Sequence, residues 1–171
     1  MLSGGSIDDV IVDALIAGGI DLVCSLPCNM LAGIIRIIED RQDHITHISL
    51  TREEEGVGIA AGAYLGGKRP AILMQNSGFG NSINALLSLT RFYEMPLLIM
   101  MSHRGGKREK IAAQIPMGDA IIPLLETLEI EYCCISKRSE IPSITKFAAD
   151  AISNSSIMAI LLEQELWDEE S

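Results

Sequence analysis

Three consecutive acids, Glu53, Glu54 and Glu55, stand directly before a run of small residues at positions 56–63. Acids are favoured in the first turn of a helix, so position alone favours a solvated, structural role for all three carboxylates. The glycines of the following run give it poor helix propensity, and such a helix is kept where another backbone or a flat ligand comes close. We therefore predict that one of the three carboxylates points into a binding site.

A second polar segment contains Gln75, Asn76 and Gly78 and follows a short apolar run. We predict a turn at residues 78–80 that opens a helix at about residue 81. The turn lacks the third glycine of a dinucleotide-binding fingerprint, and no Gly-Lys-Ser/Thr follows it as in a P-loop. Its neutral polar groups suit hydrogen bonds to a heterocycle or a carbonyl better than a triphosphate. A nucleotide or sugar-phosphate site on this turn remains an alternative.

Basic residues concentrate at positions 103–110, which hold four of the thirteen lysines and arginines. A solvated loop explains such a cluster equally well. At the mouth of a site, however, the same charges attract a small polyanion. Arg104 is best placed for a bidentate contact with a carboxylate, sulfonate or phosphonate, and Lys107, Arg108 and Lys110 steer the anion.

Alternating apolar runs and helical periods occur six times along the chain. Fully apolar strands that alternate with helices are typical of a parallel sheet covered on both faces. The pattern therefore predicts an α/β fold, a three-layer α/β/α arrangement with a six-stranded, mostly parallel sheet. We expect the strands at residues 20–26, 44–50, 70–75, 96–102, 131–135 and 157–162. The helices with the clearest ends are expected at residues 6–17, 53–65, 81–92, 119–128 and 139–153.

Polar residues follow the first four of these strands. Right-handed crossovers place the carboxyl ends of parallel strands at one edge of the sheet, and ligands bind along that edge. Asn29 comes after the first strand, Glu53 after the second, Gln75 after the third and Arg104 after the fourth. The topology therefore predicts that these side chains share one site.

The length of 171 residues and the hydrophobic fraction of 48% predict one domain, residues 1–171, with a full core. No apolar stretch is long enough to span a membrane, and residues 1–5 lack the features of a signal peptide, so we expect a cytoplasmic protein. The surplus of aliphatic residues suggests burial against another subunit. The net charge of −10 argues against nucleic acid as a partner.

The cysteines and histidines give no metal site by spacing. The four cysteines form no CxxC pair and are expected to be free thiols: Cys24, Cys28, Cys133 and Cys134. His47 and His103 are candidate proton shuttles, although a structural role is favoured for a lone histidine on a strand. His44 is expected to be exposed.

The spacing of Glu53 and Gly62, nine residues apart with Tyr64 beyond, resembles the pyrimidine-binding (PYR) domain of thiamine-diphosphate-dependent 2-oxo acid decarboxylases. Glu54 and Glu55 do not fit that spacing. The run Gln-Asn-Ser-Gly-Phe-Gly-Asn at residues 75–81 and the Arg-Gly step after the fourth strand resemble the branch that includes phosphonopyruvate and sulfopyruvate decarboxylases. The resemblance covers nearly the whole chain.

The resemblance implies that Glu53 is the catalytic acid, which hydrogen-bonds N1′ of the aminopyrimidine of thiamine diphosphate and favours its imino tautomer. That tautomer removes the C2 proton of the thiazolium, and the carbanion attacks the 2-oxo carbon before CO2 leaves. The cofactor-binding residues implied are Glu53, Gln75, Asn76 and Gly78. The substrate-binding residues implied are Asn29, Arg104, Lys107 and Gln114.

The chain departs from full-length relatives in lacking the Gly-Asp-Gly motif and later Asn that hold Mg2+ and the diphosphate. It has only Gly118-Asp119-Ala120, and no Asn follows before Asn154. The resemblance therefore implies no metal site here but a hetero-oligomer, in which a beta subunit holds Mg2+ and the diphosphate. Among the relatives, sulfopyruvate decarboxylase of coenzyme M biosynthesis is divided in this way.

The expected substrate is a small anionic 2-oxo acid. Arginine and lysine bind sulfonate and phosphonate alike, so 3-phosphonopyruvate stays open beside 3-sulfopyruvate. A non-catalytic binding or regulatory subunit is the remaining alternative, and such a subunit would tolerate the loss of Glu53.

Overall fold

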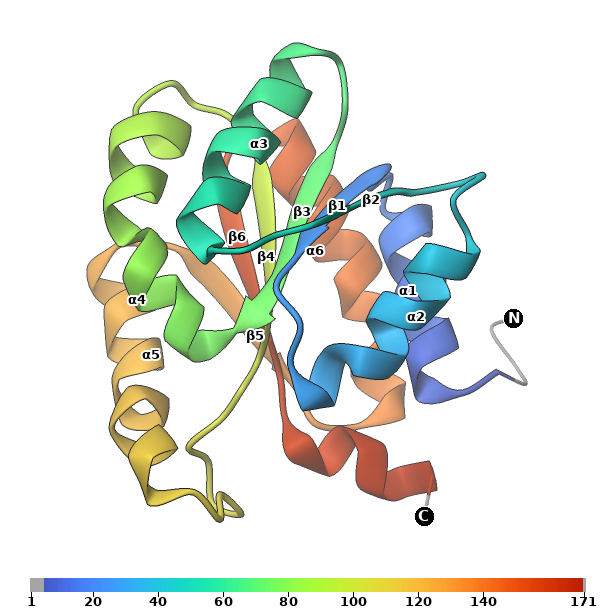
Figure 1. Ribbon diagram of the computed structural model, residues 1–171, viewed down its shortest axis with the longest axis vertical. Coiled ribbons are helices and arrows are strands. Elements are labelled where there is room, and N and C mark those ends of the chain that lie inside the picture. Colours follow the sequence, from blue (N-terminus) through green and yellow to red (C-terminus); the bar gives the residue numbers. More distant parts are fainter. Residues whose placement is uncertain (1–4, 171) are drawn as a thin grey trace.

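The computed structural model describes residues 5–170 and has a six-stranded sheet at its centre (Figure 1). The strand order is β2-β1-β3-β4-β6-β5, and all neighbouring pairs are parallel. The predicted α/β class is confirmed, with an all-parallel sheet in place of a mostly parallel one. The strands are β1 (Leu22–Ser25), β2 (Thr46–Ser49), β3 (Pro70–Gln75), β4 (Leu97–Ser102), β5 (Glu131–Ile135) and β6 (Ile157–Leu162).

Helices cover both faces of this sheet, as expected for parallel strands joined by crossovers. One face carries α1, α2 and α6, and the other carries α3, α4 and α5 (Figure 1). The helices are α1 (Ile7–Ala17), α2 (Ala32–Asp40), α3 (Glu53–Leu65), α4 (Asn76–Ala85), α5 (Ile115–Thr127) and α6 (Pro142–Ser153). No helix within residues 5–170 combines the length and the apolar character that crossing a bilayer requires.

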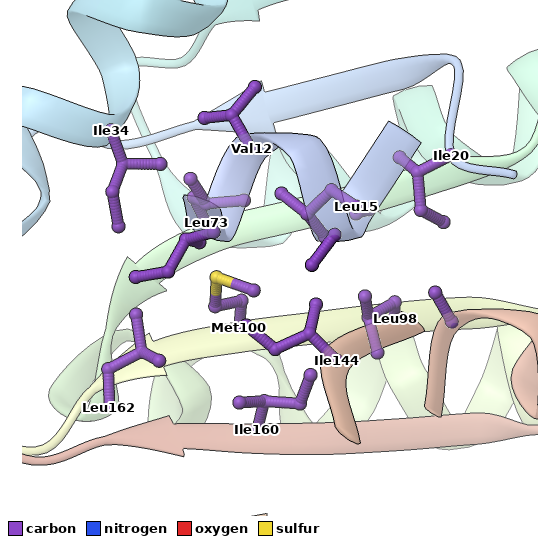
Figure 2. Close-up of a cluster of buried hydrophobic side chains, with 14 of the residues drawn as sticks. Val12, Leu15, Ile20, Ile34, Leu73, Leu98, Met100, Ile144, Ile160 and Leu162 are labelled. Carbon is purple, nitrogen blue, oxygen red and sulfur yellow. The ribbon is translucent and has the colours of Figure 1, made fainter. Parts of the chain in front are cut away.

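Strand side chains alternate between two apolar layers, because successive residues of a strand point to opposite faces. On β3, Leu73 belongs to the layer under α1, α2 and α6, whereas Ile72 belongs to the layer under α3, α4 and α5. Figure 2 shows the first layer, where Leu73, Met100 and Ile160 gather with side chains of α1 and α6. Full burial of each such side chain stabilises the fold by about 1.5–3 kcal/mol. The two apolar layers therefore hold the strands, and the residues that follow them, in place.

The start of α1 is fixed by its own sequence. The backbone N–H of Asp9 donates to Ser6 Oγ at 3.1 Å, and the Asp9 carboxylate accepts from the Ser6 N–H at 3.3 Å. This reciprocal pair satisfies two N–H groups that a helix start otherwise leaves without partners. The predicted helix start is confirmed, and Gly19 beyond its end adopts φ +90°.

The predicted turn at residues 78–80 is wrong, because α4 begins at Asn76 and these glycines lie inside it. Phe79 is fully buried and anchors the first turn against the core, which outweighs the poor helix propensity of the glycines. The helix continues into a π-helical segment, η2 (Leu86–Arg91). The polar segment after β3 is therefore a helix start that presents backbone N–H groups, rather than a loop.

The predicted start of the next helix is also wrong, because α5 begins at Ile115 and not at residue 119. Pro116 lies in its first turn, where the missing N–H costs no intrahelical hydrogen bond. Pro123 therefore lies in the helix interior, and not near the start of a helix that begins at residue 119. A short 3-10 turn, η3 (Ala112–Gln114), precedes the helix, so the polar loop after β4 ends earlier than predicted.

The acidic C-terminal segment docks on the fold as a 3-10 helix, η5 (Gln164–Glu170). Leu166 is fully buried, and Trp167 Nε1 donates to Asp8 Oδ1 at 2.8 Å. Arg108 forms ion pairs with Asp168 and with Glu165. The segment thus joins the start of α1 to the basic loop after β4. Elsewhere, all four cysteines are free thiols, as predicted.

Candidate active site

The three acids at the start of α3 have different partners. Glu55 accepts from Thr51 Oγ1 at 2.7 Å and from the Arg52 N–H at 3.2 Å, and the Thr51 bond lowers the pKa of this carboxyl. Glu54 forms an ion pair with Arg52 at 2.6 Å. Local contacts therefore account for Glu54 and Glu55 as first-turn acids, and they leave Glu53 for another role.

The Glu53 side chain lies between α3 and the start of α4. Its Oε2 accepts from Asn81 Nδ2 at 3.3 Å, and a Cβ added at Gly78 would stand 2.6 Å from its Oε1. A side chain at position 78 would therefore displace the carboxylate, so the glycine there is required by this close approach. Across residues 5–170, no ion pair is recorded for Glu53, so the carboxylate keeps hydrogen-bonding capacity for a ligand.

The start of α4 joins this carboxylate to the loop after β4. Asn76 is fully buried, with Nδ2 donating to the Arg104 carbonyl at 2.8 Å and Oδ1 accepting from the Arg104 N–H at 3.3 Å. Gln75 Nε2 donates to Ser77 Oγ at 2.8 Å and to Gln114 Oε1 at 2.9 Å. Four predicted site residues, Gln75, Asn76, Arg104 and Gln114, are therefore brought together.

Arg104 forms a bidentate ion pair within its own loop. Its Nε and Nη2 donate to the two carboxylate oxygens of Glu109 at 2.7 Å each, and the Glu109 side chain is only 4% exposed. The Arg104 guanidinium and the N–H of Ile111 lower the pKa of Glu109 to about 2. The same hydrogen bonds raise the pKa of Arg104. Part of this guanidinium is thus occupied before any ligand arrives.

The loop folds back on the start of α5 through two glycines. Gly105 has φ +89°, and a Cβ there would lie 2.4 Å from the Gln114 carbonyl. A Cβ at Gly118 would lie 2.5 Å from Gly105 Cα. Both positions exclude a side chain, so Arg104 and Gln114 are held on a closed and compact loop.

Asn29 and Lys107 line hollows other than the pocket that contains Arg104. Asn29 is exposed at the start of η1 (Asn29–Leu31), where it lines a hollow of about 410 Å³ together with Trp167. Lys107 is exposed beside His103 and Glu163 rather than in the pocket that contains Arg104. Their assignment to substrate binding stays a prediction.

The two candidate proton shuttles have structural partners. His47 Nε2 lies 2.8 Å from Ser25 Oγ, and its Nδ1 lies 3.5 Å from Glu39. His103 Nδ1 lies 2.7 Å from Glu163 Oε1, and its Nε2 lies 3.4 Å from the Gly118 carbonyl. The hydrogen bond with Glu163 raises the pKa of His103. Through these two contacts the His103 ring ties the end of β4 to the residue after β6 and to α5.

A hollow of about 450 Å³ lies at the opposite edge of the sheet, between the starts of β4 and β6. Its Arg91 is paired with Glu129, and ligands of open α/β sheets bind at the carboxyl edge instead. Within the described part of the chain, no group of three His, Cys, Asp or Glu side chains is placed to hold a metal ion. The candidate site is therefore the edge that contains Glu53 and Arg104.

Sequence reasoning misses the roles of Asn81 and Glu109 at this edge. Asn81 ends the polar run that begins at Gln75. It stands three residues after Gly78, so in a helix that begins at Asn76 both residues lie on the side that meets Glu53. Glu109 is the one acid among the four cations of residues 103–110, which marks it as their counter-ion. Its four hydrogen bonds depend on a loop conformation that no periodicity indicates.

Comparison with known sequences gives a consistent family. Residues 6–114 match the model described as thiamine pyrophosphate enzyme, N-terminal TPP binding domain. The sulfopyruvate decarboxylase subunit alpha of Methanococcus maripaludis is 46% identical over 94% of this chain and 96% of its own length. The corresponding subunit of Methanocaldococcus jannaschii is 44% identical over 92% of this chain and 94% of its own length.

More distant relatives are longer proteins. The phosphonopyruvate decarboxylase of Streptomyces viridochromogenes is 35% identical over 71% of this chain and 32% of its own length. Among solved structures, a 2-oxoglutarate:ferredoxin oxidoreductase from Magnetococcus marinus has a TM-score of 0.71 at 12% identity, over 94% of this chain and 29% of its own. A split-gene transketolase has a TM-score of 0.63 at 16% identity, over 94% of this chain and 52% of its own. At these identities the structures show the fold alone.

Proposed function

Because this chain belongs to the sulfopyruvate decarboxylase alpha-subunit family, we propose that it supplies the pyrimidine-binding half of a thiamine-diphosphate-dependent carboxy-lyase. The reaction converts 3-sulfopyruvate into sulfoacetaldehyde and CO2, the step that serves coenzyme M biosynthesis. Residues 1–171 act as one PYR domain in this proposal. The observation that carries it is the position of Glu53. This residue precedes Gly62 by nine residues in the sequence, lies at the carboxyl edge of the sheet, and has its carboxylate against Gly78 of α4.

The residues around Glu53 fit the pyrimidine end of the cofactor. One oxygen of Glu53 accepts from Asn81, and no hydrogen bond is recorded in residues 5–170 for the other, which is available to a ring nitrogen. When bound, thiamine diphosphate supplies the electron sink that lets a 2-oxo acid lose CO2. Glu53 would hold the pyrimidine by a hydrogen bond to the N1′ atom of the ring, and the carboxyl group would donate or share its proton there. Gln75 and Gly78 line the same side.

Asn76 is assigned a supporting part at this site as well as its predicted place beside the cofactor. Both polar atoms of its side chain are bonded to the backbone of Arg104, so the amide fixes the distance between the two halves of the site. Arg104, Lys107, Gln114 and Asn29 are assigned to the substrate. The loop that carries Arg104 and Gln114 is already closed, which supports a preformed anion site.

The diphosphate and its Mg2+ are assigned to a partner subunit. The relatives that match this chain over nearly their whole length are named as alpha subunits, which implies a second chain. This chain carries Gly118-Asp119-Ala120 in place of the Gly-Asp-Gly motif that holds the metal and the diphosphate in full-length relatives, and this supports placing both on the partner. Assembly with a beta subunit that carries a diphosphate-binding domain would complete the site.

Phosphonopyruvate decarboxylation is the second candidate. It is favoured by the 35% identity to the Streptomyces viridochromogenes enzyme, which covers a smaller part of both chains. Guanidinium and ammonium groups bind a phosphonate as they bind a sulfonate. Side-by-side kcat/KM values for the two substrates, measured on the assembled enzyme, decide between them.

The test is decarboxylation by the chain assembled with its partner subunit, thiamine diphosphate and Mg2+. We expect release of CO2 and sulfoacetaldehyde from 3-sulfopyruvate, and a fall of about 10²–10⁴-fold in kcat for Glu53→Gln. Glu54→Gln is the matched control, because it removes the same charge one residue away, from a carboxylate that forms an ion pair with Arg52. Thermal unfolding checks that both variants keep the fold.

Near-normal turnover by Glu53→Gln would remove the assignment of Glu53 and leave the chain as a scaffold for a catalytic partner. Equal losses in Glu53→Gln and Glu54→Gln would point to a general effect of charge on the helix. Absence of any 2-oxo acid decarboxylation by the complete assembly would overturn the proposed function itself.

A further inference from the structure

Glu109 uses every part of its carboxylate inside the loop after β4. Its Oε2 accepts from Arg104 Nε and from the Gly105 N–H, and its Oε1 accepts from Arg104 Nη2 and from the Ile111 N–H. The four donor–acceptor distances lie between 2.7 and 3.1 Å. With so many partners the carboxylate is poorly suited to chemistry. It serves to hold the guanidinium.

Arg104 keeps part of its hydrogen-bonding capacity in this arrangement. A guanidinium has five N–H donors, and Glu109 takes one on Nε and one on Nη2. The Nη1 group and the second hydrogen of Nη2 form the other edge of the guanidinium that can bind an anion bidentately. Within residues 5–170 no partner is recorded for that edge. A second anion can therefore be bound bidentately by a guanidinium that is already fixed in place.

A pocket of about 360 Å³ adjoins this pair at the carboxyl edge of the sheet. Its walls come from the loops after β1 and β4 and from η5, and the lining residues are Met30, Arg104, Arg108, Glu109, Lys110, Ile111 and Gln164. Such a volume accommodates a small ligand with a single charged group. A chain of contacts links the pocket to Glu53, because Glu53 lies against Gly78 at the start of α4 and Asn76 of the same helix binds the Arg104 backbone.

The charges around the pocket are unequally compensated. Arg104 is neutralised by Glu109, and Arg108 is paired with Glu165 and Asp168. Lys110 is exposed, and the described part of the chain provides it with no recorded ion pair. Lys110 therefore supplies the net positive charge of the pocket, whereas Arg104 supplies directed hydrogen bonds.

From this geometry we infer that Glu109 is a positioning residue for substrate selection. It holds the Arg104 guanidinium by one edge, so that the remaining edge and Lys110 bind the distal sulfonate of the substrate while its 2-oxo acid end lies toward the bound cofactor. The inference rests on the proposed function for the identity of the anion. A pinned arginine loses little side-chain entropy on binding and leaves a sulfonate-free 2-oxo acid without its anchor.

The test compares Glu109→Gln with wild type in the complex with the partner subunit, thiamine diphosphate and Mg2+. The glutamine keeps the size of the side chain but replaces one carboxylate oxygen by an NH2 group, which cannot accept from N–H donors. Arg104 therefore loses the bidentate ion pair that fixes its guanidinium. We expect KM for 3-sulfopyruvate to rise about tenfold, the effect of weakening one charge-assisted contact, with kcat within about threefold of wild type. Unchanged KM, or loss of kcat at unchanged KM, overturns the inference.

Glu140→Gln is the matched control for this substitution. Glu140 accepts from the N–H groups of Ser136 and Lys137 at 2.8 and 3.1 Å, and so closes a comparable loop after β5 without an arginine. A purely structural role for loop-closing acids predicts similar kinetics for Glu109→Gln and Glu140→Gln. The positioning role predicts a raised KM for Glu109→Gln alone.

Lys110→Met keeps the inference testable if Glu109→Gln fails to fold, because the exposed Lys110 side chain makes no recorded contact that folding needs. We expect KM to rise about tenfold at low salt, and the difference from wild type to shrink as salt screens the charge. Lys68→Met, at an exposed position before β3, controls for the loss of one positive charge. Equal KM values for the two lysine variants contradict the inference.

Calorimetry with 3-sulfopropanoate separates this inference from the proposed function, since that probe carries the sulfonate but no 2-oxo group. We expect Glu109→Gln and Lys110→Met each to bind it about tenfold more weakly than wild type, while Glu140→Gln binds it normally. Normal binding by the first two variants overturns the sulfonate subsite even if the enzyme is active. Weakened binding without any decarboxylase activity supports the subsite and overturns the proposed function.

Discussion

Glu53 and Glu109 are the same residue type at the same edge of the sheet, and their surroundings differ in the number of donors. Glu53 has one recorded hydrogen bond in the described structure, a 3.3 Å contact with Asn81. Glu109 receives four, two of them from a guanidinium. A carboxylate with few hydrogen-bond donors around it remains available to bind a ligand or transfer a proton. A carboxylate that is saturated with donors stabilises the loop around it.

Glycine is used in opposite ways beside the two carboxylates. Gly78 makes room for the Glu53 side chain and adds no bond to it. Gly105 lets the chain turn so that its N–H reaches Glu109. Each glycine thus keeps one carboxylate in its role, and changing either glycine tests the comparison.

The largest effect is expected for Gly78→Ala. The new Cβ would stand 2.4 Å from Glu53 Cγ, so the side chain must rotate and the carboxylate moves. We expect kcat to fall about 10²-fold, as for a catalytic group misplaced by about 1 Å, with the chain still folded. Turnover by the enzyme assembled with its partner measures the effect.

Gly80→Ala is the matched control, because the nearest atom to a Cβ there is the flexible Met117 Cε at 3.9 Å. It should keep nearly full activity. If Gly78→Ala were as active as Gly80→Ala, activity would not depend on the present position of the Glu53 carboxylate. The catalytic role that separates Glu53 from Glu109 would then be contradicted.

A smaller effect, on the free energy of unfolding, is expected when the pH is lowered. The pKa of Glu109 is lowered from 4.5 to about 2, so this carboxylate stabilises the fold fully above pH 4.5 and loses that contribution as the pH falls toward 2. The difference in free energy of unfolding between wild type and Glu109→Gln should therefore shrink between pH 5 and pH 3. Urea denaturation at several pH values measures it. A difference that stays constant over this range would mean that the charge on Glu109 contributes nothing to the loop.

The smallest effect is expected for Gly62→Ala on the outer side of α3, where an added Cβ meets no atom within 4 Å. Alanine is favoured over glycine in a helix by about 0.5–1 kcal/mol, so the separate chain should become more stable by that amount in urea denaturation. If α3 packs against the partner subunit, the same variant should co-purify less well with it. A variant that is destabilised on its own would show that this side of α3 is not open.

The elements that surround these carboxylates were largely predictable from sequence. The strands at residues 70–75, 131–135 and 157–162 and the helix at residues 53–65 have the predicted ends. The strands at residues 70–75 and 157–162 are apolar runs whose side chains are almost all buried, so hydrophobicity alone indicates them. The early starts of α4 and α5 were not predictable from propensity, because Phe79 packing and a proline in the first turn override it.

The candidate site was predictable only in part. The spacing of Glu53 and Gly62 and the strand-end positions of Gln75 and Arg104 are visible in the chain. Contacts between distant segments, such as that of His103 with Glu163, arise only when β4 and β6 pair. The contacts of Glu109 depend on one loop conformation, which sequence periodicity does not report.

The all-parallel sheet has a consequence for the charge at its carboxyl edge. Each helix from α2 to α6 is the next α-helix after a strand of this sheet, so five helix N-termini lie toward its carboxyl edge, and α4 starts at the residue directly after β3. Each N-terminus carries roughly half a positive charge from its aligned peptide dipoles. The fold itself therefore creates a local positive potential in a chain of net charge −10. The basic side chains of the loop add to the positive partial charge that the helix N-termini already provide.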